Sequence, residues 1–316
     1  MSPFTSSRSR SVAAQGEARL IGEIRRWLGD ASPAAPFGIG DDCAVIPPTR
    51  RHQLVTTDPV IHGQHFDNSI PARAVGAKLL KRNLSDIAAM GGRPVAAVLS
   101  LALAPETDLA WLRGFYLGLA ATARKYRVKI VGGDITQGPR EFFGAFLTLH
   151  GESAGARVIT RRGAGLGDTI LVTGRLGGSR QGHHYRFTPR LAEGRWLAGQ
   201  PEVRAMMDVS DGIAKDVHAL TPPGLVASIS PAHLPVSAAA RSASRRSGRP
   251  AWVHALTDGE DYELLFVLNR RTRPEDLQRR WRRRFRTPLH AIGHVGRKTV
   301  AGHVSWDSLH GYEHLR

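Results

Sequence analysis

The chain is organised around one stretch, Asn83-Leu84-Ser85-Asp86-Ile87-Ala88-Ala89-Met90-Gly91-Gly92. With about 100° of rotation per residue, the apolar side chains between positions 75 and 90 fall within one arc of a helix, and Asn83 and Asp86 lie inside that arc. A carboxylate there costs several kcal/mol of desolvation unless a cation or hydrogen-bond donors meet it. Gly91-Gly92 then ends the helix as a C-cap does. The stretch therefore predicts a helix that carries part of a functional site.

On the other side of this helix, we expect Lys78, Lys81 and Ser85 to point away from the apolar arc. Strands and helices alternate before and after it, which predicts an α/β or α+β protein. Small residues and glycines at 151–155 mark a domain boundary. We expect helices at 17–28, at 75–90 and after Thr107 as a cap, and strands at 54–58, 95–102, 128–131, 142–150, 169–173 and 264–268.

The composition excludes several classes of protein. A hydrophobic content of 41% in 316 residues suffices for one large core or two ordinary ones. The sequence has no run of about 18 apolar residues, so we expect no membrane-spanning helix. The Ser- and Arg-rich segment 1–16 has no apolar core of a signal peptide and is expected to be a disordered tail. A single cysteine, Cys43, excludes an internal disulfide and a Cys-x-x-Cys motif, which agrees with a cytoplasmic location.

The net charge of +17 raises the question of nucleic-acid binding. Much of the excess is local, in the segments 241–249 and 270–286. A helix is expected after Pro274, with Trp281 and Phe285 along one apolar edge. Two interpretations stay open for its arginines: a solvated face of an amphipathic helix, or a surface that steers anionic substrates or binds nucleic acid weakly.

Acidic residues recur in turns, where side chains from several elements can converge. They are Asp42, Asp58, Asp86, Asp134, Asp208 and Asp211. An isolated Asp-Gly pair is usually only a turn, but the set as a whole is harder to explain in that way. Carboxylates and hydroxyls without histidine or cysteine are the donors that select Mg²⁺, which keeps waters and phosphate oxygens as its other ligands. The pattern predicts a site that handles phosphates.

These motifs resemble, in order along the chain, those of thiamine-monophosphate kinases, which share a superfamily with aminoimidazole ribonucleotide synthetase and selenophosphate synthetase. The segments 83–92 and 259–265 are the most specific parts of the resemblance. The other matching segments are 37–45, 56–58 with His65-Phe66, 132–139, 162–168, 208–212 and Gly311-Tyr312. The resemblance covers most of the chain from about residue 17 onward, and it includes neither a P-loop nor a protein-kinase glycine loop.

The resemblance implies transfer of the γ-phosphoryl group of ATP onto the phosphate of thiamine monophosphate, giving thiamine diphosphate. No general base is implied, because the acceptor is already an anionic phosphate oxygen, and catalysis would come from alignment and charge neutralisation. The implied fold has an ATP- and Mg²⁺-binding N-terminal α/β domain at 17–150, which forms a homodimer with its copy, and a C-terminal α+β domain at 151–316.

The resemblance also assigns roles to individual residues. Several Mg²⁺ ions would be held by Asp42, Thr56, Thr57, Asp58, Asp86, Asp134, Asp208 and Asp211. ATP would contact Gly133, Asp134, Arg162 and Ser210. The thiamine side would contact His65, Glu260 and Tyr312. Asp258 departs from the family pattern and adds a carboxylate beside Glu260, while the segment 178–203, with its histidines and arginines, is either a phosphate patch or a solvated loop.

Three alternative functions stay open. The first is a sister enzyme, but a selenophosphate synthetase would need a reactive Cys or selenocysteine with a Lys near the N-terminus, and a hydrogenase-maturation relative a C-terminal Cys. The second is a basic nucleic-acid-binding protein, which does not explain the acid-bearing turns, so nucleic acid is not the expected partner. The third is an inactive homologue, and the intact acids argue against it.

Overall fold

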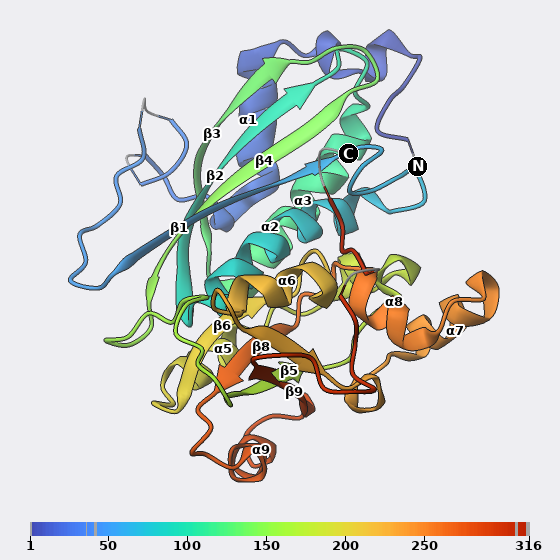
Figure 1. Cartoon of the computed structure of the whole chain (residues 1–316). Coiled ribbons are helices and arrows are strands. Elements are labelled where there is room, and N and C mark those ends of the chain that lie inside the picture. The colour runs from blue at the N-terminus through green and yellow to red at the C-terminus, as the bar shows by residue number, and fades with distance from the viewer. Residues whose placement is uncertain (1, 36, 41–42, 307–308, 314–316) are drawn as a thin grey trace. The chain divides into compact units, whose positions relative to one another are not determined.

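The computed structural model describes residues 2–35, 37–40, 43–306 and 309–313, and it divides into two compact units (Figure 1). The N-terminal unit comprises Met1–Ile87 and Arg93–Glu152, and the C-terminal unit comprises Ala88–Gly92 and Ser153–Arg316. Each unit combines helices with a sheet, so the predicted mixed class is confirmed. Asp42 lies outside the described residues. None of the helices in the described part of the chain is long and apolar enough to cross a membrane.

The N-terminal unit is built on a sheet with the strand order β1-β4-β2-β3 (Figure 1). Strand β1 runs antiparallel to β4, and β2 runs parallel to β3. The first helix has the bounds that the sequence predicts. The elements are α1 (Glu17–Leu28), β1 (Gln53–Ile61), α2 (Ala72–Ala89), β2 (Gly92–Leu103), α3 (Leu109–Tyr126), β3 (Lys129–Gln137) and β4 (Phe143–Ser153).

Helices α2 and α3 cross at very short range because each contributes a glycine to the contact. A Cβ on Gly76 would lie 2.0 Å from the carbonyl oxygen of Phe115, and a Cβ on Gly118 would lie 1.9 Å from that of Arg73. No larger side chain fits at either position. The helices cover a core in which the rings of Phe115 and Phe143 lie 5.4 Å apart and those of Trp111 and Phe143 lie 4.8 Å apart.

Helix α2 is buried on nearly its whole circumference, which corrects the prediction for its polar side. Lys78 and Ser85 are 0% and 1% exposed. Lys81 is half-buried, and its burial, followed by the charge of Lys125, lowers the pKa of its amine. On the side of Lys78, the helix lies against β1 and the loop that follows this strand. Lys78 is tolerated there because its Nζ donates to the carbonyl of His65 at 2.8 Å.

The start of α3 and the N-terminal segment also differ from expectation. The helix is capped by Asp108, whose carboxylate accepts from the backbone N–H of Trp111 at 2.9 Å, and not by Thr107, whose hydroxyl donates to Ala104. The segment expected to be a disordered tail lies along residues 105–108. The N–H of Thr5 donates to the carbonyl of Glu106 at 2.9 Å, and Arg10 forms a 2.7 Å ion pair with Asp108.

The C-terminal unit is built on a sheet with the strand order β6-β8-β5-β9-β7. Strand β8 is buried along its whole length, because alternate residues pack against helices on opposite faces of the sheet. Strands β5 and β8 have the predicted bounds. The elements are β5 (Thr169–Thr173), α4 (His183–Arg186), α5 (Leu191–Ala198), β6 (Val203–Asp208), α6 (Ile213–Leu220), β7 (Val226–Ile229), α7 (Ala238–Ser247), α8 (Ala251–Thr257), β8 (Leu264–Leu268), α9 (Pro274–Arg282) and β9 (Leu289–Gly296).

The close crossing of α2 and α3 predicts the effect of adding one methyl group. Gly118→Ala should lower the free energy of unfolding by about 1–3 kcal/mol, because the new Cβ meets backbone atoms that cannot move independently. Gly22→Ala is the matched control, since nothing lies within 4 Å of its Cβ position on α1. It should be neutral or stabilising by up to about 1 kcal/mol. Urea denaturation measures both; equal stabilities of the two variants would contradict this description of the contact.

Candidate active site

Strand β1 and helix α2 bring three of the predicted metal ligands together. Thr56 and Asp58 point to the same side of β1, because side chains alternate along a strand. Asp86 lies about one helical turn from Arg82 on α2. The hydroxyl of Thr56 donates to Asp86 Oδ2 at 2.5 Å, and Arg82 Nη2 donates to Asp58 Oδ1 at 3.1 Å. Arg82 was not predicted as a site residue from the sequence. Its position four residues before Asp86, on the same helix face, was the available signal.

Other predicted residues of this unit lie elsewhere on the sheet. Thr57 faces the opposite side of β1, where its hydroxyl donates to the carbonyl of Leu147 at 3.2 Å. Asp134 is an exposed residue of β3, the edge strand opposite β1, and the strands between them put it roughly 14 Å from β1 across the sheet. Gly133 is required beside it, because a Cβ would lie 2.1 Å from the carbonyl oxygen of Leu99. The sheet therefore does not bring Asp134 close to Asp58.

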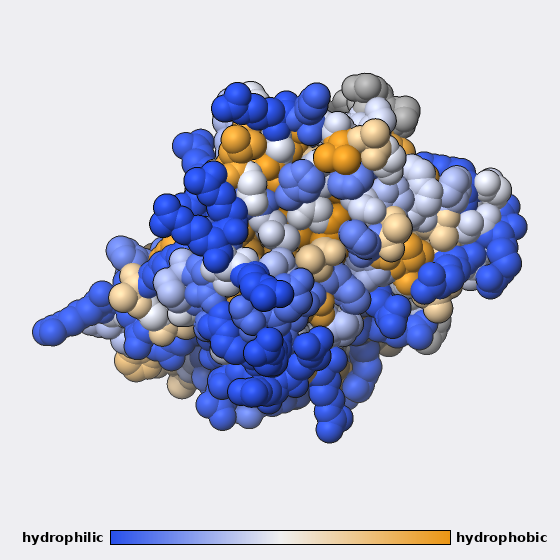
Figure 2. Space-filling view, turned by 60° about the horizontal axis from the view of Figure 1, so that its bottom comes forward, coloured by the Kyte–Doolittle hydropathy of each residue, from blue (hydrophilic) through white to orange (hydrophobic). Residues whose placement is uncertain are grey.

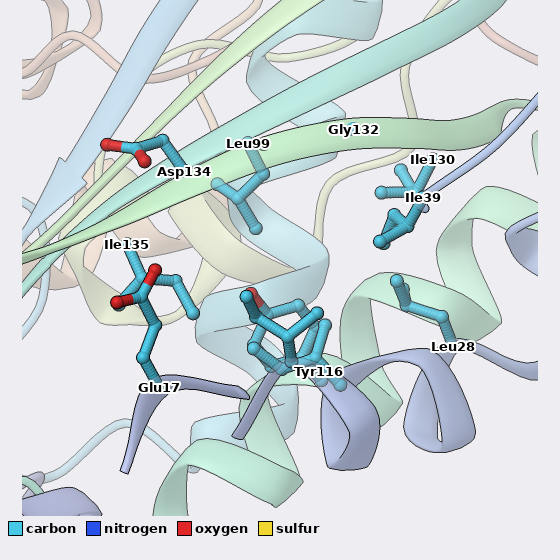
Figure 3. Close-up of a pocket in the computed structure, with 12 residues that line it drawn as sticks. Glu17, Leu28, Ile39, Leu99, Tyr116, Ile130, Gly132, Asp134 and Ile135 are labelled. Atoms are coloured by element: carbon cyan, nitrogen blue, oxygen red, sulfur yellow. The ribbon is translucent and has the colours of Figure 1, made fainter. Parts of the chain in front are cut away.

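Gly133 and Asp134 border a pocket of about 100 Å³ in the N-terminal unit. In Figure 3, the carboxylates of Glu17 and Asp134 lie at one end of this pocket, and Leu28 and Ile130 lie at the other. Tyr116 forms part of the wall, and burial raises the pKa of its hydroxyl, so the group stays neutral. A pocket with apolar walls and an acidic end suits a flat ring that is attached to a metal-bound group.

His65 lies in the loop after β1, and two contacts fix its position. Its Nδ1 accepts from the N–H of Ile61 at 3.1 Å, and its carbonyl accepts from Lys78. Because Nδ1 is an acceptor, the neutral ring carries its proton on Nε2. The imidazole is therefore oriented by β1 through Nδ1.

In the C-terminal unit, the turn between β6 and α6 carries Asp208, Ser210 and Asp211. Asp216 supports this turn from α6, since its Oδ2 accepts from the N–H of Ser210 at 3.0 Å and of Asp211 at 3.1 Å. Burial, followed by the charges of Asp208 and Asp211, raises the pKa of Asp216 to about 7. Crowded carboxylates of this kind are stabilised by a bound cation. Asp216 was not predicted as a site residue from the sequence.

Glu260 and Tyr312 lie on either side of the same turn. The N–H of Glu260 donates to the carbonyl of Ser210 at 2.7 Å, and the N–H of Tyr312 donates to that of Asp211 at 2.9 Å. Glu260 has a φ of 53°, a conformation that is unfavourable for a non-glycine residue, and the contact with Ser210 helps to hold it. Lys215 pairs with Asp211 at 2.7 Å and donates to the carbonyl of Tyr312 at 2.9 Å. Two of the three predicted thiamine-side residues, Glu260 and Tyr312, therefore contact the turn that carries Ser210 and Asp211.

Arg162 lies apart from this group. It is exposed, and its N–H donates to the hydroxyl of Thr160 at 3.3 Å. Thr160 accepts from Met206 of β6, and the next glycine, Gly163, approaches Arg204. That alignment places Arg162 beside the start of β6, roughly 13 Å along the strand from Asp208.

The segment 178–203 is not a solvated loop, because its side chains contact the core of its own unit. Arg190 donates to Glu263 through Nε at 2.7 Å and Nη2 at 2.5 Å. His183 Nε2 lies 2.9 Å from the carbonyl oxygen of Asp261. The extra carboxylate of Asp258 accepts from the N–H of Gly178 at 2.7 Å. It therefore holds a glycine turn in place.

The donor chemistry of these residues fits Mg²⁺. Among the described residues, no group of three or more His, Cys, Asp or Glu side chains is assembled to hold a metal. Each unit instead offers a few oxygens: Asp58, Asp86 and Thr56 in one, Asp208 and Asp211 in the other. Mg²⁺ usually takes one or two protein carboxylates and completes its shell with waters and phosphate oxygens. The arrangement therefore suits a metal that arrives with a phosphorylated ligand.

The arginine-rich segment forms a separate surface. Helix α9 buries Leu277 and Trp281, while the arginines of the segment are exposed: Arg279, Arg280, Arg282, Arg283, Arg284 and Arg286. Figure 2 brings the side with α9 forward and shows hydrophilic side chains gathered there. Arg280 pairs with Glu202, and Arg279 pairs with Asp276 at 3.2 Å. The helix is amphipathic as predicted. Its exposed arginines agree both with a solvated face and with a surface that steers anions or binds nucleic acid weakly.

Comparisons with known proteins find thiamine-monophosphate kinases at more than 30% identity over most of the chain. Residues 40–152 match the family model of the AIR synthase related protein, N-terminal domain. The thiamine-monophosphate kinase of Rhodopirellula baltica is 36% identical over 248 residues, which are 75% of this chain and 77% of that protein. The crystal structure of thiamine-monophosphate kinase from Stenotrophomonas maltophilia has a TM-score of 0.73 at 31% identity and covers 89% of this chain and 94% of its own. The structure of AaThiL complexed with AMPPCP and TMP has a TM-score of 0.69 at 29% identity, with 92% and 96% covered.

The raised pKa of Asp216 predicts a pH dependence of stability. A carboxyl whose pKa is about 7 in the folded state and about 3.9 in the unfolded state favours folding at low pH. Its contribution is lost as the pH rises from about 4 to about 7. Asp216→Asn removes this term and keeps an oxygen for the N–H groups of Ser210 and Asp211. Its melting temperature relative to that of the wild type should therefore be higher at about pH 8 than at about pH 5, measured in EDTA.

The control is Asp276→Asn, which changes an exposed carboxylate on α9. Its difference from the wild type should be nearly the same at both pH values. If the difference between Asp216→Asn and the wild type is also the same at both pH values, then the pKa of Asp216 is not raised, and the carboxylates of Asp208 and Asp211 do not crowd it.

Proposed function

The chain belongs to the thiamine-monophosphate kinase family, and we propose that it transfers the γ-phosphoryl group of ATP to the phosphate of thiamine monophosphate, giving thiamine diphosphate. One observation carries the proposal: acids and hydroxyls gather at one place in each unit, Thr56, Asp58 and Asp86 in the first and Asp208, Ser210 and Asp211 in the second. The AaThiL structure with AMPPCP, an ATP analogue, and TMP supports both substrates.

We assign the nucleoside part of ATP to the pocket beside Gly133 and Asp134. Its apolar walls suit the faces of an adenine ring, and its acidic end suits the side from which metal-bound phosphates would extend. The hydroxyl of Ser210 is a small donor for a phosphate oxygen, since the N–H of Ser210 already donates to Asp216. Arg162 offers an exposed guanidinium for a phosphate.

Mg²⁺ ions held by Thr56, Asp58 and Asp86 in the N-terminal unit and by Asp208 and Asp211 in the C-terminal unit, with Asp42 and Asp134 as further carboxylates, would neutralise charge on the phosphates during transfer, whereas Thr57 faces the other side of β1. The protein's own contribution is to keep these oxygens in place: Thr56 orients Asp86, and Asp216 orients the turn of Ser210 and Asp211. No side chain needs to remove a proton, because the acceptor is an anionic phosphate oxygen.

The thiamine side of the substrate is assigned to His65, Glu260 and Tyr312. Glu260 is fixed by its N–H contact with Ser210 and by the hydroxyl of Tyr262, which donates to its Oε1 at 3.0 Å. A carboxylate suits a cationic heteroaromatic ring. Tyr312, which is 43% exposed, supplies an aromatic ring of the kind that stacks on such a ring.

We also propose that the N-terminal unit forms a homodimer through the face of its sheet that lies opposite α2. That face carries Val55, Val98 and Phe146, which are 69%, 39% and 39% exposed. Thr57 and Thr148 add small side chains between them. A second copy suits this surface, because two twisted sheets pack face to face and a two-fold axis matches like residues.

The dimer predicts the effect of one charged substitution. Phe146→Glu should give a monomer in sedimentation velocity, because two carboxylates would be buried near the symmetry axis. Val300→Glu is the control, since Val300 is also exposed, at 46%, but lies in the C-terminal unit. It should sediment as the wild type does. A dimer of Phe146→Glu as tight as that of the wild type would exclude this interface.

The activity predicts a sharp substrate preference. With ATP and Mg²⁺, the purified protein should convert thiamine monophosphate to thiamine diphosphate and leave thiamine unchanged, because the proposed transfer uses an acceptor oxygen that is already anionic. Chromatography of the fluorescent thiochrome derivatives separates the products. Phosphorylation or pyrophosphorylation of free thiamine would contradict the proposal.

A pocket variant tests the nucleotide assignment in the same assay. Ile21→Trp fills space beside Tyr116 and Ile135, so KM for ATP should rise at least tenfold, while KM for thiamine monophosphate stays within about twofold. A rise in KM for thiamine monophosphate with an unchanged KM for ATP would contradict the assignment of the nucleoside to this pocket.

A further inference from the structure

Arg82 contacts Asp58, a carboxylate that the proposed function assigns to Mg²⁺. Only 10% of its side chain is exposed, and two contacts with β1 hold the guanidinium. Nη1 donates to the carbonyl of Pro59 at 2.7 Å, and Nη2 donates to Asp58 Oδ1 at 3.1 Å. Arginine stays protonated under all ordinary conditions. A fixed positive charge therefore occupies one oxygen of a carboxylate that is proposed to bind Mg²⁺.

The two contacts of Arg82 differ in kind. The contact with Pro59 is made to the backbone, and metal binding at Asp58 does not require its loss. The contact with Asp58 is an ion pair, and it is the one with which a cation must compete. One turn further along α2, Asp86 accepts from the neutral hydroxyl of Thr56. Of the proposed ligands in this unit, Asp58 therefore accepts from a cation, and Asp86 accepts from a neutral hydroxyl.

We propose that Arg82 is a built-in counter-ion of Asp58, which stabilises the metal-free protein and which Mg²⁺ must displace. This inference rests on the proposed metal site. A largely buried carboxylate is costly without a partner, so the guanidinium offsets its desolvation when no metal is bound. The same charge repels a divalent cation a few ångströms away. Arg82 therefore lowers the affinity of the site for Mg²⁺ until phosphates bring further negative charge.

The test compares Mg²⁺ binding in full-length variants without nucleotide. Arg82→Met keeps an apolar stem and removes the charge, and Arg82→Gln also keeps a donor for Pro59, which guards against loss of folding. Arg93→Met is the matched control, because Arg93 pairs with Glu152 in the same unit but touches no proposed ligand. Titration calorimetry measures Mg²⁺ affinity, and thermal melting in EDTA measures the stability of the metal-free protein.

Both Arg82 variants should bind Mg²⁺ at least tenfold more tightly than the wild type and melt at a lower temperature in EDTA. Arg93→Met should bind Mg²⁺ as the wild type does. If wild-type binding is too weak to measure, measurable binding in the Arg82 variants supports the proposal. Affinities within twofold of the wild type, or no binding in any variant, would overturn it, even if the melting temperature falls.

Asp58→Asn separates failure of this inference from failure of the proposed function. If Asp58→Asn abolishes Mg²⁺ binding while the Arg82 variants bind as the wild type does, only the counter-ion role is wrong. If Asp58→Asn binds Mg²⁺ with wild-type affinity, Asp58 is not a ligand, and the proposed metal site fails together with the inference.

Discussion

The burial of helix α2 is the constraint on which the N-terminal unit depends. Because α3 and the sheet enclose it, each polar residue on α2 needs a partner within the protein. Lys78, Arg82 and Asp86 are spaced four residues apart and so share one face. Their partners are the carbonyl of His65, the Asp58-Pro59 pair and the hydroxyl of Thr56. A slip of β1 by one residue would leave these charges buried without partners, so they specify the register of the strand against the helix.

The C-terminal unit uses buried acids for a related purpose. Asp216 accepts two N–H groups of the Ser210-Asp211 turn, and Asp261 accepts from the N–H of Gly177 at 2.8 Å. Burial raises the pKa of Asp261 well above its ordinary value. Acids that hold the backbone thus lie next to acids that are proposed to bind metal. Residue type alone does not separate the two groups, because both consist of aspartates.

Features that depend on neighbouring residues were predictable from the sequence, and features that depend on distant segments were not. The apolar periodicity of 17–28 and the apolar runs at 169–173 and 264–268 are local, and the structure has those bounds. Lys78 donates to the carbonyl of His65, in the loop after β1, and periodicity cannot report that contact. The opposite faces of Thr57 and Thr56 follow from strand alternation, but the resemblance that grouped them carries no geometry. The contact of Arg82 with Asp58 needed both the strand and the helix.

Each unit offsets the repulsion between its own carboxylates, and the groups that do so differ in part. Each gathers carboxylates that a metal–phosphate ligand would stabilise, and each must fold before that ligand arrives. In the C-terminal unit, the excess charge is reduced by protonation of Asp216, whose pKa is raised to about 7, and by the 2.7 Å ion pair between Lys215 and Asp211. In the N-terminal unit, Arg82 supplies a guanidinium that cannot lose its proton. A proton can leave to solvent, whereas Arg82 stays attached to α2. Under the proposal, the charge of Arg82 would therefore remain close to Asp58 and oppose Mg²⁺ in a way that a protonated carboxyl does not.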